Sequence, residues 1–360
     1  MGEDSSISCA SMADSQWVPF VLAMQQSRAR LKATLKCTEC QPLHLIINGE
    51  GGSGKSWLID HIVKDVNFVF SGSNQQHSPD RVQLLAHQCT AAFNINGQTI
   101  CSALGFSSFS RSAFSTPYAS LAAQKNGPTK LKQIQERYKD IHLVVIDEFN
   151  VISCGMLYWI DQRMREIWPS HRHLRFGGRD IVFTGDSAQL DPVVPYSLST
   201  PTHKIANEAH KKGREIWEEI ELECTLTSQN RGKLDPEWFD ALRRLRKLEP
   251  TPADVDLFHS RCCLTEQYSD SFAAAKHIAH KNVDAETANQ KCILANTTPI
   301  LQIKSQHHVQ QKRLHHQRDI PAGTVHALVS EAEAVNSDRD RVVGTQIKLC
   351  WCSSYANLQC

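Results

Sequence analysis

The stretch INGEGGSGKSWLID spans residues 47–60 and contains a glycine, four further residues, and then Gly54-Lys55-Ser56. This spacing is typical of a phosphate loop, in which backbone N–H groups surround phosphate, Lys55 reaches the β- and γ-phosphates, and the Ser56 hydroxyl binds Mg²⁺. The apolar run 43–47 before it predicts a strand buried on both faces. Leu58, Ile59, Ile62 and Val63 predict an amphipathic helix after it. The predicted nucleotide-binding residues are Gly49, Glu50, Gly51, Gly52, Ser53, Gly54, Lys55 and Ser56.

Three further short apolar runs, 81–86, 143–146 and 181–184, repeat this pattern, with a helix expected over 130–138. Strands that alternate with helices predict an α/β fold with a parallel sheet flanked by helices. The carboxyl ends of such strands form the ligand crevice. Because polar motifs follow these strands, we expect the motifs to meet in one crevice.

Asp147 and Glu148 directly follow the apolar run 143–146. A carboxylate at this position can hold Mg²⁺, and a second carboxylate beside it can activate the attacking water. We therefore predict that Asp147 is a metal ligand and Glu148 the catalytic base, which favours hydrolysis over simple nucleotide storage. In the segment TGDSAQLDPV, residues 184–193, the Gln189 amide is suited to sensing the γ-phosphate, and Asp186 to supporting the metal site.

Arg231 precedes a predicted helix in which Asp235 is the cap and Pro236 lies in the first turn. An arginine from a second domain, placed on the γ-phosphate, would couple domain closure to the nucleotide state. The basic residues over 243–247 lie largely opposite the apolar face of this helix. They either face solvent or contact nucleic acid.

The chain has 360 residues, which suggests about two domains. Its formal net charge of +1 excludes a global basic field, so any nucleic-acid surface has to be local. No apolar run approaches the ~18 residues of a membrane span. The acidic N-terminus has no apolar core and is not a signal peptide. The 13 scattered cysteines favour a reducing intracellular compartment.

In this order, the motifs resemble those of the Pif-one family, which are RecD-like DNA helicases of superfamily one. The resemblance covers residues 40–295. Its segments are GEGGSGKS, AAFNINGQTICSALG, VVIDEFNVIS with MLYWIDQRMREI, FTGDSAQLDPV, LTSQNRG with FDALRRLR, and HIAHKNVDAETANQ.

The resemblance implies two RecA-like domains that use ATP and Mg²⁺ to move 5′ to 3′ on single-stranded DNA and to separate duplex junctions. We expect a monomer that acts in genome maintenance, such as DNA repair, recombination or telomere maintenance, in the nucleus or the mitochondrion. By the same resemblance, the DNA-binding candidates are Phe93, Asn94, Gln98 and Thr99, although Phe93 fits the core equally well. Gln25 and Gln26 are candidates for the family's adenine-reading glutamine.

Some positions depart from the family pattern. His87-Gln88-Cys89 replaces Pro-Thr-Gly, and Cys101 replaces a histidine. We expect a leader and helix over 1–40, a first RecA-like domain over 41–225, and a partial second one over 226–360, with a polar insertion at about 300–345. Two motifs of the second domain are not recognised, which implies a truncated chain. The alternative function is therefore an ATP- and DNA-binding module without translocation.

Overall fold

The computed structural model describes residues 12–71, 80–106, 113–228, 232, 235–262, 278–294, 300–304 and 346–350. The chain divides into two compact units, residues 1–260 and 261–360. The second unit contains α10 (Asn282–Leu294) and an antiparallel pair of strands, β7 (Ile300–Lys304) and β8 (Gln346–Cys350). Most of the insertion expected at about 300–345 lies outside the described residues, and the boundary expected at 225/226 stays a prediction.

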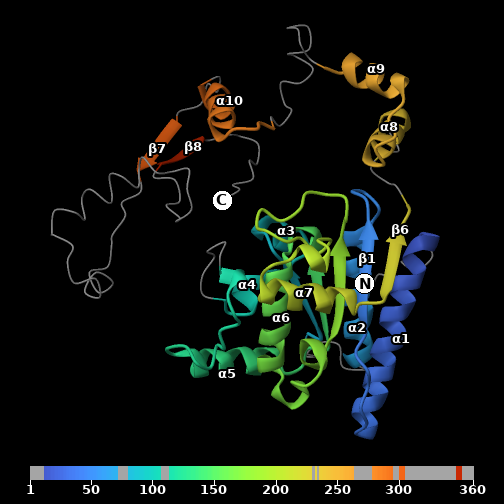
Figure 1. Cartoon of the computed structure of the whole chain (residues 1–360), viewed down its shortest axis with the longest axis vertical. Coiled ribbons are helices and arrows are strands. Elements are labelled where there is room, and N and C mark those ends of the chain that lie inside the picture. Colours follow the sequence, from blue (N-terminus) through green and yellow to red (C-terminus); the bar gives the residue numbers. More distant parts are fainter. Residues whose placement is uncertain are drawn as a thin grey trace, which may run out of the picture. The chain divides into compact units, whose positions relative to one another are not determined.

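The first unit is built on a six-stranded sheet with the strand order β3-β2-β4-β5-β1-β6 (Figure 1). Every neighbouring pair in this sheet is parallel. All the carboxyl ends therefore lie at one edge, as expected for an α/β fold. The strands are β1 (His44–Gly49), β2 (Val82–Ala86), β3 (Gln98–Thr99), β4 (Leu143–Asp147), β5 (Asp180–Gly185) and β6 (Leu222–Leu226).

Helices cover both faces of this sheet. Helices α1, α2 and α3 contribute to the core on one face, and α4, α5, α6 and α7 to the core on the other. Short 3₁₀ helices at Ala113–Ser115, Phe149–Val151, Pro169–His171, Arg175–Gly178 and Thr202–Lys204 join these elements. The helices of the first unit are α1 (Asp14–Lys36), α2 (Lys55–Ser71), α3 (Cys89–Asn94), α4 (Ile100–Ala103), α5 (Gly127–Tyr138), α6 (Cys154–Ile167), α7 (Glu208–Glu218), α8 (Pro236–Arg246) and α9 (Pro252–Ser260).

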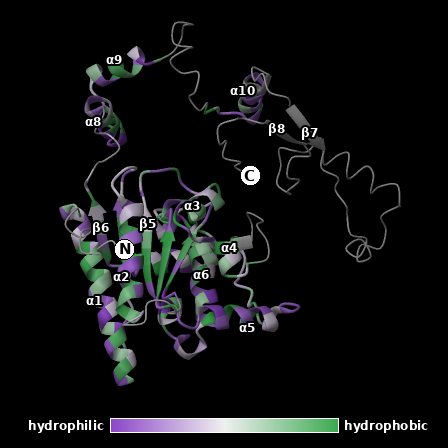
Figure 2. Cartoon of the chain, turned by 180° about the vertical axis from the view of Figure 1, so that it is seen from behind, coloured by the Kyte–Doolittle hydropathy of each residue, from purple (hydrophilic) through white to green (hydrophobic). Residues whose placement is uncertain are grey.

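The middle residues of β1, β4 and β5 are apolar (Figure 2). They are buried, as expected for strands covered on both faces of a parallel sheet. Successive side chains of a strand point to opposite faces of the sheet. Leu45 and Ile47 accordingly join the core beneath α1 and α2, whereas Ile46 joins the core beneath α6. Val145 and Val144 divide in the same way. In the strand order of the sheet, the end of β5 lies between the ends of β4 and β1.

Two close contacts fix helices to this frame. Helix α7 approaches α6 at Gly213, where a β-carbon would lie 1.7 Å from the carbonyl oxygen of Cys154, so only glycine fits. Helix α1 is held by Arg30, whose Nε and terminal nitrogen donate to the two Asp180 oxygens at 2.7 and 2.6 Å. Both of these side chains are buried, and such a pair is stable only when its hydrogen bonds are complete.

The predicted strands and the predicted helices after the phosphate loop, over 130–138 and after Asp235 are present. The Asp235 carboxylate caps α8 by accepting from the Trp238 N–H at 3.2 Å. The pattern did not reveal β3, β6 or α7. β3 has only two residues, and β6 is an edge strand whose side chains are mostly exposed. Among the described helices, none combines the length and apolar character that crossing a membrane requires.

Candidate functional site: a nucleotide pocket at the strand ends

The phosphate loop connects the end of β1 to the first residue of α2, as the sequence predicts. Gly52 and Gly54 have φ angles of 92° and 86°, a region that glycine enters without steric cost. The Lys55 ammonium donates to the carbonyl oxygens of Gly49 and Glu50 at 2.6 and 3.0 Å. Lys55 therefore lies across the loop, and the start of α2 adds the N–H groups and positive dipole of a helix N-terminus.

Two segments distant in sequence hold the loop in place. The Ser53 carbonyl oxygen accepts from the Ser228 hydroxyl at 2.8 Å and from the Gln16 amide at 3.4 Å. The same Gln16 amide donates to the Gly54 carbonyl oxygen at 3.3 Å. Gln16 lies in the first turn of α1 and is buried. These contacts satisfy the carbonyl oxygens of Ser53 and Gly54 with donors from outside the loop.

Asp147 and Glu148 are at the carboxyl end of β4. Asp147 is buried and accepts a hydrogen bond from the Thr184 hydroxyl on the adjacent strand β5. Glu148 has a φ of 58°, in the left-handed region where non-glycine residues are uncommon and often functional. Burial raises the pKa of Glu148 above its usual value, the neighbouring Asp147 adds to the rise, and Lys55 opposes it. A carboxylate with a raised pKa is a better proton acceptor near neutral pH.

The segment after β5 carries the predicted sensor. The Gln189 amide donates to Asp186 Oδ2 at 3.3 Å, and the Ala188 N–H donates to Asp186 Oδ1 at 3.1 Å. Both Asp186 oxygens also accept from Arg246 on α8. Burial by itself would raise the pKa of Asp186, but the bonds from Arg246 and Ala188 outweigh burial and hold this pKa below its usual value. Asp186 is thus engaged with protein groups, and its predicted role in supporting the metal site stays a prediction.

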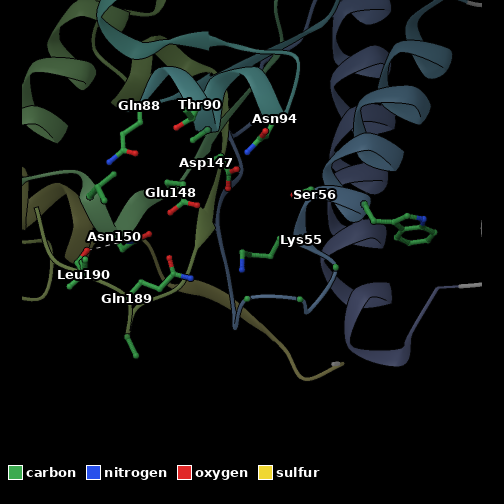
Figure 3. A pocket seen from close by; sticks show the side chains of 17 residues that line it. Lys55, Ser56, Gln88, Thr90, Asn94, Asp147, Glu148, Asn150, Gln189 and Leu190 are labelled. Atoms are coloured by element: carbon green, nitrogen blue, oxygen red, sulfur yellow. Dashed lines mark hydrogen bonds between the residues drawn. The ribbon is translucent and has the colours of Figure 1, made fainter. Parts of the chain in front are cut away.

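These segments line a pocket that is open to solvent and has a volume of about 860 Å³. Figure 3 shows Lys55 and Ser56 on one side, Asp147 and Glu148 at the centre, and Gln189 opposite them. The strand ends of β1, β4 and β5 thus bring the predicted side chains together. The lining residues are Gly51, Gly52, Gly54, Lys55, Ser56, Trp57, Gln88, Thr90, Ala91, Asn94, Asp147, Glu148, Asn150, Val151, Ala188, Gln189 and Leu190.

The donor set fits a nucleoside triphosphate with Mg²⁺. Lys55 and three glycines of the loop, Gly51, Gly52 and Gly54, line the pocket, which suits a polyphosphate. The Ser56 hydroxyl and the Asp147 carboxylate supply the oxygen ligands that Mg²⁺ prefers. Of the other predicted loop residues, Gly49 and Glu50 line a neighbouring pocket of about 430 Å³, and Ser53 is buried.

The predicted DNA contacts lie on α3, β3 and the start of α4. Phe93 is 83% exposed, so its side chain is not part of the core. Asn94 faces the nucleotide pocket and also an adjoining pocket of about 460 Å³, which Gln98 lines as well. The Thr99 hydroxyl caps α4 by accepting from the Ser102 N–H at 3.3 Å. Cys101, where the family has histidine, is buried in the core.

Arg231 lies outside the described residues. Gln26 does not face the phosphate loop, because its amide donates to the Gln41 carbonyl and to Asp180 at 2.7 and 2.9 Å. Gln25 is exposed. The glutamine at the loop is Gln16, which the sequence analysis missed because nothing local distinguishes it from other polar helical residues.

Comparisons with known proteins agree with this geometry. The family model for PIF1-like helicases matches residues 22–237, more than half of the chain. The ATP-dependent DNA helicase PIF1 of Saccharomyces cerevisiae is 27% identical over 210 residues, which is 56% of this chain and 21% of that protein. The ATP-dependent DNA helicase PIF1 of Emericella nidulans is 25% identical over 227 residues, or 63% and 28%. The chain therefore spans only about a quarter of the length of these relatives.

Solved structures support the fold. The Pif1 helicase of Candida albicans superimposes with a TM-score of 0.54 at 19% identity, covering 86% of this chain and 61% of that one. A Pif1 helicase double mutant from Bacteroides gives a TM-score of 0.53 at 18% identity, covering 82% and 61%. Together with the family match, the parallel sheet and its phosphate loop lead to one conclusion: the chain belongs to the PIF1-like helicase family.

Proposed function

We propose that this chain is an ATP-dependent DNA helicase motor that hydrolyses ATP in the pocket at the strand ends. The observation that carries the proposal is the convergence of Lys55, Ser56, Asp147, Glu148 and Gln189 on one pocket from separate segments (Figure 3). A protein that only stores nucleotide does not need a base beside its metal ligand. For Arg231 we propose, as the sequence predicts, a contact with the γ-phosphate.

Nucleotide binding begins at the loop. Lys55 exchanges its contacts with the Gly49 and Glu50 carbonyls for contacts with the β- and γ-phosphates. Ser56 and Asp147 would hold Mg²⁺, and a bound Mg²⁺ would neutralise charge on the phosphates. Gln16 is our assignment for the glutamine that reads adenine, because it is the described α1 glutamine whose amide contacts the loop.

Hydrolysis then depends on two side chains. Glu148 accepts a proton from the attacking water, and its raised pKa makes it a stronger base than an exposed carboxylate. Gln189 faces the same pocket, where its amide can donate to phosphate and accept from water. Because Gln189 is tied to Asp186, its position depends on the loop that follows β5.

Single-stranded DNA is the proposed substrate track. Phe93 is largely exposed, and an exposed aromatic ring provides a stacking surface for bases of any sequence. Thr90 and Asn94 on the same short helix line the nucleotide pocket. Helix α3 thus connects the two sites, which supports coupling of nucleotide state to DNA grip. Action on genomic DNA in the nucleus or mitochondrion, movement 5′ to 3′, and roles in repair, recombination and telomere maintenance belong to this proposal.

The test is unwinding of a fluorescent forked duplex by the full chain, with ATP or with a non-hydrolysable ATP analogue. We expect strand separation with ATP only, and only on forks with a 5′ single-stranded tail. Nucleotide-dependent binding of the fork without separation in either condition would contradict the proposal. That result would support the alternative, an ATP- and DNA-binding module without translocation.

A further inference from the structure

The basic residues of α8 do not simply face solvent. Arg244 pairs with Asp254 on α9, where the Nε–Oδ2 distance is 2.8 Å. Arg243 donates to Glu50 of the phosphate loop at 3.1 Å. Arg246 donates to Asp186, in the segment that carries Gln189. Two of the three arginines therefore connect α8 to the two segments that bound the nucleotide pocket.

The contact between Arg246 and Asp186 is the stronger of these connections. Two guanidinium nitrogens donate to the two carboxylate oxygens, one of them at 2.9 Å, in the bidentate geometry that gives strong and directional pairs. The Asp186 side chain is only 2% exposed, whereas Arg246 is 30% exposed. A carboxylate that is this buried needs its partner, because an unpaired buried charge is costly.

Asp186 in turn holds the segment that carries Gln189, the predicted sensor of the γ-phosphate. Its Oδ1 accepts from the Ala188 N–H, its Oδ2 from the Gln189 amide, and its carbonyl oxygen from the Gln189 N–H at 3.1 Å. The turn that presents Gln189 to the pocket is therefore built around Asp186. Because Arg246 donates to both carboxylate oxygens, it fixes the rotamer on which the turn depends.

We propose that Arg246 is a positioning residue, which holds Gln189 in the nucleotide pocket through Asp186 and thereby makes hydrolysis depend on the placement of α8. The role of Gln189 in hydrolysis rests on the proposed function, but the mechanical part, in which Arg246 orders the turn 186–189, does not. Arg244 is a matched control, because it lies on the same helix, carries the same charge and pairs away from the pocket.

The first test is hydrogen exchange of the full chain without nucleotide. In Arg246→Gln we expect the amides of Ala188 and Gln189 to exchange about tenfold faster. The reason is that the variant loses the charged hydrogen bonds that fix the Asp186 side chain, around which the turn is built. Arg244→Gln should leave these amides unchanged. The α8 amides should stay protected in both variants, which shows that the helix is intact. Unchanged exchange at Ala188 and Gln189 in Arg246→Gln would overturn the proposal.

The second test separates positioning from folding by steady-state ATP hydrolysis. Arg246→Gln should lower kcat about tenfold and leave the KM for ATP within about twofold. Lys55 keeps its contacts, and the phosphate loop loses only the long pair between Arg246 and Glu50 at 3.9 Å, while Arg243 still donates to Glu50 at 3.1 Å. Arg246→Lys should recover part of kcat. If Arg246 acts through Gln189, the double variant Gln189→Ala/Arg246→Gln is no slower than Gln189→Ala alone.

Additive losses in the double variant, or equal losses in Arg246→Gln and Arg244→Gln, would contradict the proposed route through Gln189. Failure of the proposed function would give a different experimental result. In that case the unaltered chain shows no turnover that depends on Lys55, while hydrogen exchange still decides whether Arg246 orders the turn.

Discussion

The side-chain amide of Gln16 donates a hydrogen bond to the carbonyl oxygen of Gly54 at 3.3 Å, which ties the first turn of α1 to the phosphate loop. We predict that Gln16→Ala weakens ATP binding. The loss of net hydrogen bonding should be about 1 kcal/mol, or roughly fivefold in Kd. Titration with a fluorescent ATP analogue measures it, and the exposed Gln25→Ala is the control. Equal affinities of Gln16→Ala and the unaltered chain would contradict this role.

A second prediction concerns stability and pH at Glu148. Its pKa is raised in the folded protein by burial and by Asp147, so the fold favours the protonated form. That stabilisation is complete below the usual value of 4.5 and is lost as pH rises through the raised value. Glu148→Gln should therefore raise Tm at about pH 7 and lose this advantage at about pH 4. Thermal unfolding measures the difference in Tm between Glu148→Gln and the unaltered chain, and Glu221→Gln at an exposed position is the control. A lower Tm for Glu148→Gln than for the unaltered chain at about pH 7 would refute the prediction.

A third prediction concerns the attachment of α1. Arg30→Ala leaves the Asp180 carboxylate buried without its cation, which should cost about 3–5 kcal/mol in the free energy of unfolding. Urea denaturation monitored by circular dichroism measures this change. The control is Arg28→Ala, an exposed position on the same helix, for which we expect less than about 0.5 kcal/mol. Similar small effects at both positions would show that the buried pair does not hold α1.

A fourth prediction concerns DNA. Phe93→Ala should weaken binding of single-stranded DNA by about 1–3 kcal/mol, the usual value for one stacked base. Because Phe93 is 83% exposed, its loss should leave the unfolding free energy nearly unchanged. Fluorescence anisotropy with a labelled oligonucleotide measures binding. Phe68→Ala on α2, also exposed, removes an equal ring elsewhere; equal weakening by both variants would count against Phe93 as a specific stacking site.

Sequence reasoning located the strands that build the site because each is a short apolar run that ends in polar residues. The phosphate loop, Asp147-Glu148 and Gly185-Asp186 all follow such runs. Their convergence could be expected, because parallel strands share one carboxyl edge. The strand order could not be read, since every strand buried on both faces has the same pattern.

The residues that sequence reasoning missed act through long-range contacts. Gln16 reaches the loop across 38 positions, and Arg246 reaches Asp186 across 60. Neither carries a local signal, because a polar residue in an amphipathic helix predicts only an exposed face. For the same reason the sequence predicts that the basic residues of α8 face solvent or nucleic acid. In the structure, Arg243 and Arg246 instead contact acidic groups at the nucleotide site.

The central claim is that Lys55 and Glu148 form a working ATP-hydrolysing site that responds to DNA. Steady-state ATP hydrolysis by the full chain, with and without single-stranded DNA, tests it most directly. We predict that DNA stimulates ATP hydrolysis by the unaltered chain and that Lys55→Ala abolishes this hydrolysis. Glu148→Gln should lower the rate of hydrolysis about 10²–10⁴-fold. Lys64→Ala, which alters an exposed lysine on the same helix, should leave both the rate and its stimulation unchanged. Turnover that survives Lys55→Ala, or ATP binding without turnover in the unaltered chain, would contradict the account.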